Sequence, residues 1–174
     1  YSEDKVVIID CEKLSVLKTI TTEDEPYGIV STLDGKKLYV THEYPGKISE
    51  INTADFKVTQ VFNAGKMTRG IALSPDEKYL FVTEFYTASV NKLDAATGKM
   101  MDQWKGRDDD NFARQITAHP TRPKVYYPHI RSRTHIIDAD GSIFPEFTIC
   151  DTSGLPDKTR RMTVAMDTFN GVYV

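Results

Sequence analysis

The sequence lacks most of the motifs that identify catalytic or cofactor-binding proteins. Its two cysteines, Cys11 and Cys150, cannot supply a haem-attachment motif or a zinc-binding thiolate cluster. A Gly-rich phosphate loop, a His-Glu-x-x-His motif and an assignable Ser-His-Asp order are also missing. We therefore assign no catalytic residue and no covalently bound cofactor.

Charge and hydropathy give no indication of nucleic acid or membrane. The 22 basic and 25 acidic residues leave a net charge of −3, which provides no bulk attraction to nucleic acid or anionic lipid. No apolar run approaches the roughly 20 residues that span a bilayer. The 174 residues are nevertheless 40% hydrophobic, enough to bury a domain-sized core. We expect no nucleic-acid partner and no membrane span.

What the sequence does contain is a repeat. Residues 70–84 match residues 28–42 without a gap, at a shift of 42 positions, and share identical Gly, Asp, Leu, Val and Thr residues. A weaker copy lies 45 positions further on, over residues 114–129, and a fourth begins 47 positions later, at Arg161. A period of about 40–45 residues is typical of a four-stranded propeller blade.

Each copy has the local chemistry of a blade. A short apolar run precedes a Ser-Pro-Asp-Glu type of turn, and a β-branched and aromatic run such as Tyr79–Thr83 follows it. No window shows a sustained helical period, so no helix longer than about two turns is expected. We predict an all-β propeller of four-stranded antiparallel blades. The blades are expected at about 28–62, 70–104 and 115–150, with partial blades at 5–20 and 162–174.

The segments Lys37–Thr41 and Tyr79–Thr83, with the turns before them, resemble the signature of YVTN-family β-propeller repeats. The resemblance covers about residues 5–138 well. Two organisations fit the four blade-equivalents: a four-bladed ring closed by its own ends, and part of a larger ring. The resemblance favours the larger ring, because most members are seven-bladed. It also implies an exported protein, periplasmic or extracellular.

The resemblance leaves two functions open. The first is a non-catalytic scaffold or interaction module that presents its loop face to a partner protein. Residues 127–132 and 167–171 are similar to propellers associated with multihaem c-type cytochromes, which implies a c-type cytochrome or other redox subunit as the partner. The alternative is a propeller enzyme, lactonase-like or dehydrogenase heavy-chain-like, with its site at the mouth of the axial channel.

Two sets of side chains are expected on the face where first strands begin and second strands end, the usual ligand side of a propeller. The residues before first strands are Arg69, Arg114 and Arg161, and those ending second strands are His42, Glu84 and His129. Packed sheets lie about 10 Å apart, so the second set is too widely spaced to share a metal ion. We expect these three as separate polar residues around a mouth, each hydrogen-bonded locally.

The three arginines are expected to converge on one mouth of the channel. Convergent cations repel one another unless they are paired. They either pair with an acidic side chain such as Glu84, an anionic ligand or a partner carboxylate, or bond a carbonyl of the neighbouring blade as structural staples.

Two polar segments remain. Arg131 and Arg133 lie in a segment with two histidines that either binds a carboxylate, phosphate or haem propionate or is only a polar loop. Three consecutive acidic residues, Asp108, Asp109 and Asp110, offer hard oxygen ligands for Ca²⁺. The spaced ligands and glycine of a calcium loop are missing, so a solvated loop is favoured there.

The packing can also be anticipated. One side of the second strand should be buried between blades in every copy: Leu38, Val40, Leu80, Val82, Val125 and Val172. Pro128 cannot donate to a ladder, so the second strand of the third blade should bend or end there. We place the two cysteines on opposite faces and expect no disulfide between them.

Overall fold

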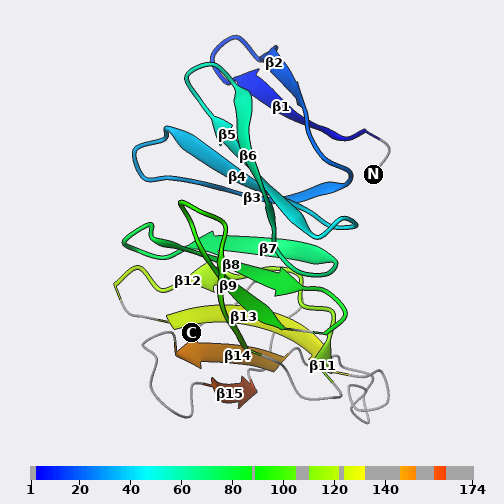
Figure 1. Ribbon diagram of the computed structural model, residues 1–174, viewed down its shortest axis with the longest axis vertical. Coiled ribbons are helices and arrows are strands. Elements are labelled where there is room, and N and C mark those ends of the chain that lie inside the picture. The colour runs from blue at the N-terminus through cyan, green and yellow to red at the C-terminus, as the bar shows by residue number, and fades with distance from the viewer. Residues whose placement is uncertain are drawn as a thin grey trace.

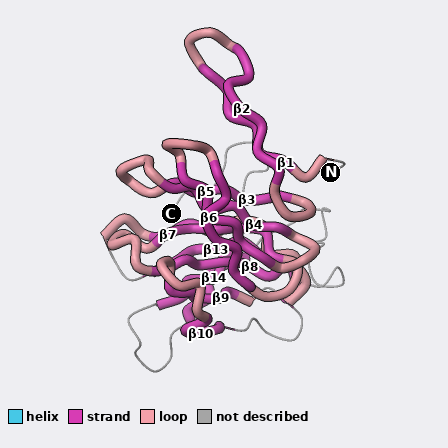
Figure 2. Tube along the Cα trace, turned by 45° about the horizontal axis from the view of Figure 1, so that its top comes forward, coloured by secondary structure: helices cyan, strands magenta, loops and turns pink. Residues whose placement is uncertain are grey.

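The computed structural model shows a stack of antiparallel β-sheets, which Figure 1 displays one above another with the N-terminal hairpin at the top. It describes residues 3–87, 89–104, 110–121, 124–131, 146–151 and 159–163. For the outer strands of the last sheet, and for most of its central strand, it describes the backbone alone. These residues contain no helix, and so none that could cross a membrane (Figure 2).

Three complete sheets follow a two-stranded one. The hairpin pairs β1 (Lys5–Asp10) with β2 (Ser15–Thr21). The next sheet runs in chain order through β3 (Pro26–Ser31), β4 (Lys37–His42), β5 (Lys47–Asn52) and β6 (Lys57–Asn63). It is followed by β7 (Thr68–Leu73), β8 (Tyr79–Glu84), β9 (Val90–Asp94) and β10 (Met100–Trp104). This architecture confirms the prediction of four-stranded antiparallel blades.

The last sheet departs from the predicted boundaries. Its strands are β11 (Asp110–Asn111), β12 (Thr117–Ala118), β13 (Lys124–Arg131), β14 (Glu146–Asp151) and β15 (Thr159–Thr163). β14 pairs with β13 and β15 pairs with β14, so residues 159–163 form the outer strand of this sheet. The sequence placed Arg161 before an innermost strand and ended this blade at about residue 150, and both placements are wrong.

The physical reason is an insertion in this copy. The first and second strands keep the repeat spacing, but residues 132–145 separate β13 from β14 and shift the outer half of the sheet along the chain. An alternating strand such as β15 fits an inner or an outer position equally well, because both carry side chains with period two.

Pro128 does not end its strand. β13 continues to Arg131, and Pro128 lies opposite Phe147 of β14. On the other edge of β13, β12 pairs with residues 125–126 and β11 with residues 130–131. Neither inner segment lies opposite Pro128, so the missing amide hydrogen costs no hydrogen bond to either of them.

The repeat is visible in the backbone. Left-handed residues recur at the same repeat position, at Glu25 (φ 51°) and Met67 (φ 51°) directly before β3 and β7, and at Phe112 (φ 59°) a few residues before β12. Glu43 N donates to Glu25 O over 3.0 Å, and Phe85 N donates to Met67 O over 3.0 Å. The predicted shifts of 42 and then 45 positions therefore hold for the inner half of the third sheet as well.

A glycine bulge opens each of the first two complete sheets. The register shifts between Pro26 and Ile29 in β3, and between Thr68 and Ile71 in β7. A threonine of the second strand fills each bulge: Gly28 N donates to Thr41 Oγ1 and Gly70 N donates to Thr83 Oγ1, both over 2.9 Å.

The same threonine hydroxyl links neighbouring blades. Thr41 Oγ1 donates to the carbonyl oxygen of Arg69 over 2.6 Å. The blades approach so closely here that a Cβ at Gly28 would collide with that same carbonyl. At Gly70 a Cβ would lie 2.7 Å from the carbonyl oxygen of Arg114. The glycine and threonine shared by the repeats therefore fix the spacing of the blades.

Hydrophobic cores lie between the sheets, and the second strand contributes to the core on each side. Leu80 and Val82 pack towards the first complete sheet, while Phe81 packs towards the last sheet. Of the residues predicted to be buried, Val40, Leu80, Val82 and Val125 are at most 2% exposed. Leu38 is half-buried, and Val172 lies outside the described residues.

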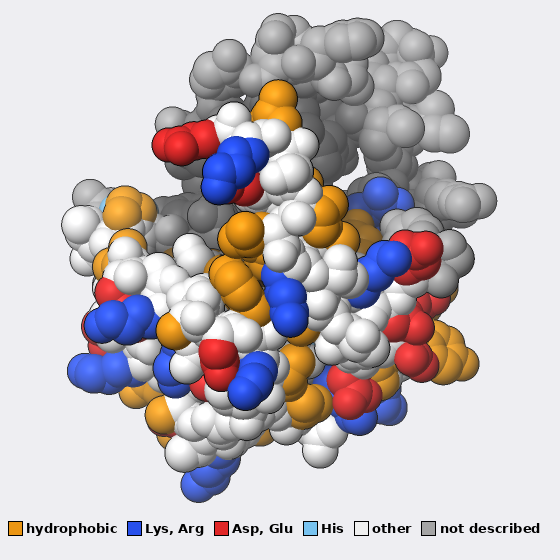
Figure 3. Space-filling view, turned by 90° about the horizontal axis from the view of Figure 1, so that it is seen from above, with side chains coloured by type: hydrophobic (Ala, Val, Ile, Leu, Met, Phe, Trp, Pro, Cys, Tyr) orange, Lys and Arg blue, Asp and Glu red, His pale blue; other side chains and the backbone are white. Residues whose placement is uncertain are grey.

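The N-terminal end of the stack has one uncovered inner position. Ile71 of β7 is 7% exposed because the preceding sheet covers it. Its equivalent in β3, Ile29, is 56% exposed, because β1 and β2 supply only the outer half of a blade. Figure 3 looks onto this end, where apolar side chains lie open among charged ones.

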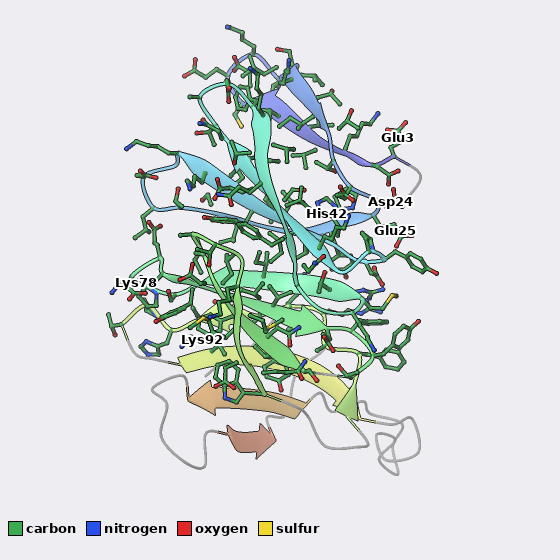
Figure 4. All side chains as sticks on the ribbon, viewed as in Figure 1. Glu3, Asp24, Glu25, His42, Lys78 and Lys92 are labelled. Atoms are coloured by element: carbon green, nitrogen blue, oxygen red, sulfur yellow. The ribbon has the colours of Figure 1, made fainter. Side chains whose placement is uncertain are left out.

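The stack has two faces that differ in which ends of the strands they carry. We call the side where first strands begin and second strands end the loop face; it includes residues 25–27, 42–44, 67–69, 84–86 and 112–114. The opposite side, with the turns between first and second strands, is the turn face. In Figure 4, His42, Asp24 and Glu25 lie at one edge of the stack and Lys78 at the other.

Replacing Gly70 with Ala tests the close approach of the blades. The new Cβ would overlap the backbone of residues 114 and 115, so we expect a loss of about 1–3 kcal/mol in the free energy of unfolding. Gln115 occupies the equivalent position of the last sheet and is exposed, so Gln115→Ala should change the value by less than about 0.5 kcal/mol. Urea denaturation measures both, and equal effects would contradict this explanation.

Candidate functional site

Arg69 lies buried between two blades on the loop face. Its side chain is 13% exposed, and its Nη2 donates to Glu43 Oε1 over 2.6 Å. The guanidinium lies over the rings of Phe85, at 3.4 Å from the centroid, and Tyr27, at 4.8 Å. These contacts join residues of both sheets, so Arg69 acts as a staple between them.

Phe85 is the centre of an aromatic cluster beside this pair. The ring of Phe85 lies 4.9 Å from that of Phe112 and 5.0 Å from that of Tyr86, while Tyr86 and Phe112 are 6.0 Å apart. Phe85 is 7% exposed, whereas Tyr86 is 58% exposed. Tyr44, the equivalent of Tyr86 in the preceding blade, is also exposed. The loop face thus has a buried aromatic base and an open aromatic surface.

Arg114 reaches the same cluster from the last sheet. Its guanidinium carbon lies 5.7 Å from the centroid of Phe85, and its side chain is exposed. Arg69 and Arg114 therefore contact one ring from neighbouring blades. Among the residues whose side chains the structure describes, Arg69 is paired with Glu43, not with the predicted Glu84, and Arg114 forms no ion pair.

Glu84 is buried beneath the face and fully engaged. Its Oε1 accepts hydrogen bonds from Asn91 Nδ2 over 3.0 Å and from Lys66 N over 3.1 Å, and its Oε2 accepts from Thr87 Oγ1 over 2.8 Å. At 6% exposure it ties the loop before β7 to the loop after β8 and to β9, and it cannot line an open mouth.

His42 occupies the equivalent position in the preceding blade. It is 0% exposed, and its Nε2 shares a hydrogen bond of 2.9 Å with Ser49 Oγ. Its Nδ1 has no hydrogen-bond partner among the described residues. Both His42 and Glu84 are thus buried rather than placed on a rim, and each is hydrogen-bonded to the third strand of its own sheet, His42 to Ser49 and Glu84 to Asn91.

Burial lowers the pKa of His42 below its ordinary value. The nearby backbone of Glu23 and Asp24 and the Glu23 carboxylate oppose this effect, and the positive charge of Lys47 reinforces it. Glu23 is itself paired with Lys47 at 2.8 Å. His42 is therefore neutral in the folded protein near pH 7.

Charge is unevenly distributed over the loop face. Glu3, Asp24 and Glu25 gather at the edge nearest the N-terminal hairpin (Figure 4). Further along the stack, the exposed charges among the described side chains of this face are cationic, from Lys66 and Arg114. The described part of the loop face therefore has an acidic side and a basic side.

The other candidate residues lie largely beyond the described side chains. Only the backbone is described for Arg131 and His129 in β13, Asp110 in β11 and Arg161 in β15. Arg133, Asp108 and Asp109 lie outside the described residues. Among the described side chains, no cluster of three or more His, Cys, Asp or Glu residues could hold a metal ion.

Sequence reasoning missed Glu43 and the aromatic cluster. The repeat alignment does contain the signal, since Glu43 and Phe85 are equivalent, as are Tyr44 and Tyr86. Aromatic residues at strand ends usually indicate core packing. The alignment also cannot tell which blade a side chain turns towards.

Comparison with solved structures establishes a β-propeller. Hydrazine synthase of Kuenenia stuttgartiensis superposes with a TM-score of 0.81 over 92% of this chain and 48% of its own, at 22% identity. Dihydro-heme d1 dehydrogenase NirN, solved in complex with DHE, gives 0.69 over 94% and 33%, at 18% identity. The β-propeller domain of Myceliophteria thermophila Cps50 (Swd1) gives 0.61 over 86% and 42%, at 14% identity.

Sequence comparison gives one partial match and no family. Antigen Lp49 of Leptospira interrogans serogroup Icterohaemorrhagiae serovar copenhageni is 30% identical over 95 residues, 47% of this chain and 21% of that protein. No protein-family profile matches the chain. The chain thus spans about a fifth of the antigen and about half of the hydrazine synthase chain. The comparisons support the propeller fold but do not establish the YVTN family.

Removing Arg69 should destabilise the fold. Arg69→Met leaves the Glu43 carboxylate, 7% exposed, without its cation, and we expect a loss of about 3 kcal/mol in the free energy of unfolding. Arg114→Met should cost less than about 0.5 kcal/mol, because its side chain is exposed. Adding Glu43→Gln to Arg69→Met should recover part of the loss. Equal effects of the two arginine variants would contradict the different roles.

The buried His42 should make stability depend on pH. Its folded pKa is below the unfolded value of about 6.5, so the unfolded chain binds the proton more readily. The free energy of unfolding should therefore fall as pH drops below about 6.5. Chemical denaturation between about pH 7.5 and 5.5 measures this, with His42→Gln as the control. The variant should lose part of the slope, and an unchanged slope would contradict the assignment.

Proposed function

We propose that this chain is a non-catalytic propeller module of an exported redox assembly. In this proposal the loop face docks onto a protein partner, a c-type cytochrome or another redox subunit. The chain itself binds no cofactor and encounters haem only in that partner.

The observation that carries the proposal is the pair of exposed tyrosines, Tyr44 and Tyr86, at equivalent positions of neighbouring blades. They are 73% and 58% exposed, although most aromatic side chains of the described sheets are packed. Tyrosine and arginine are enriched among the residues that dominate the energy of protein interfaces. A tyrosine has few rotatable bonds, so little conformational entropy is lost when it is held in a contact.

The scaffold beneath these side chains is preorganised. Tyr86 contacts the buried Phe85, which Arg69 holds from its other side. Ala113 N donates to Phe85 O over 3.2 Å and fixes the adjoining loop to the last sheet. A surface that does not rearrange on binding avoids the cost of ordering loops.

The redox character of the partner rests on the structural neighbours. Two of them are named as a hydrazine synthase and a dihydro-heme d1 dehydrogenase. At this low sequence identity, the likeness supports a shared fold and not a shared activity. The redox partner and the exported location therefore belong to the proposal and require their own test.

Retention of haem proteins on the immobilised chain tests this function. The probe is the exported-protein fraction of the source cells, and the readout is the reduced-minus-oxidised haem spectrum of the retained protein. Tyr44→Ala/Tyr86→Ala should abolish retention. Leu33→Ala, an 88% exposed side chain on the turn face, should leave it unchanged.

Two results would overturn the proposal. The first is retention that is absent from the wild-type chain or is unaffected by the tyrosine substitutions. The second is turnover of a simple lactone, or reduction of an artificial electron-acceptor dye, that a loop-face substitution abolishes. The second result would make the chain an enzyme.

A further inference from the structure

We infer that Arg114 is the point at which the loop face receives an acidic side chain of a protein partner. This inference rests on the proposed docking role of that face. It separates Arg114 from Arg69, although the two occupy equivalent positions of the repeat.

The two arginines differ in one residue of the blade before them. The guanidinium of Arg69 is paired with Glu43, the first residue after β4. The first residue after β8 is Phe85, so the blade before Arg114 offers a ring where its predecessor offers a carboxylate. Among the side chains that the structure describes, Arg114 thus has no counterpart of the anion that its repeat equivalent has. An acidic group from outside would complete the same arrangement.

The backbone of Arg114 is held firmly while its side chain is exposed. Ala113 is 0% exposed, and the carbonyl oxygen of Arg114 packs against Gly70. The left-handed Phe112 turns the chain directly before this point. The side chain itself is exposed and lies beside the Phe85 ring. A guanidinium held next to an aromatic face is a more selective carboxylate receptor than a freely moving cation.

The surroundings define the chemistry of the partner group. Lys66 adds a second exposed cation to this side of the loop face, and the described carboxylates of Glu43 and Glu84 are both buried and already bonded. Tyr86 and the half-buried Phe112 provide apolar surface beside the charge. The group that fits is a Glu or Asp side chain adjacent to an aromatic or aliphatic residue.

Nuclear magnetic resonance of the arginine Nε–Hε groups tests the inference directly. The probe is an amidated, acetylated peptide, Gly-Phe-Glu-Phe-Gly, and the matched control has Gln in place of Glu. The Arg114 resonance should shift with the Glu peptide and not with the Gln peptide, while that of Arg69 should remain in place. Arg114→Gln should weaken binding of the Glu peptide by about threefold to tenfold.

A second variant supplies the missing carboxylate from within. Phe85→Glu places at position 85 the residue type found at position 43. Provided that this variant is folded, as cooperative melting would show, it should bind the Glu peptide as weakly as Arg114→Gln does.

The third variant, Asp108→Asn/Asp109→Asn/Asp110→Asn, removes the acidic residues nearest to Arg114 in the sequence. Its Arg114 resonance should match that of the wild type without peptide. A shift would mean that the chain itself already pairs Arg114 and would overturn the inference.

Two further arms identify the source of the carboxylate. Acetate and iron protoporphyrin carry carboxylates without a peptide. Saturation by iron protoporphyrin, with no response to the Glu peptide, would replace the acidic side chain by a haem propionate and overturn the inference. The last outcome separates this inference from the proposed function. If the Arg114→Gln variant still retained haem protein, and the wild-type chain did not respond to the Glu peptide, the role of Arg114 would be rejected and the proposed docking function would stand.

Discussion

The close approach of neighbouring backbones at the glycine bulges is the constraint on which this structure depends. At Gly28 the carbonyl of the next blade leaves no room for a side chain, and Thr41 uses one hydroxyl to satisfy both that carbonyl and the bulged amide. The donor and the acceptor would otherwise be buried without partners, at a cost of about 1–3 kcal/mol each. The spacing of the sheets, and with it the position of every loop-face residue, follows from this contact.

The same contact explains why the two arginines lie close together. Arg69 stands immediately before the bulge at Gly70, and the carbonyl oxygen of Arg114 lies against the same glycine, so this close approach sets the two residues beside each other on the loop face. The neighbouring blade then decides what each arginine meets. One blade supplies a carboxylate and the next supplies an aromatic ring, and a change at one repeat position converts an internal staple into an exposed cation.

Most of the fold could be predicted from the sequence, because its repeat carries backbone requirements as well as hydrophobicity. The glycine, the threonine and the turn residues have fixed roles, and Val40, Leu80, Val82 and Val125 are buried as predicted. The outer half of the third blade could not be predicted, because β15 has a strand pattern that fits several positions. At the candidate site, the sequence selected Arg69 and Arg114 but not Glu43, whose importance depends on a contact between blades.

The exposure of Ile29 has a consequence for the order in which the molecule opens. Each sheet in the stack is stabilised by its immediate neighbours, so its resistance to opening is set locally, as in repeat proteins. Within the described residues, β1 and β2 have a neighbour on one side only and carry exposed Ile9, Val16 and Leu17. Their amide hydrogens therefore exchange with solvent first, while those of β8, enclosed by cores on both sides, exchange only when the stack as a whole unfolds.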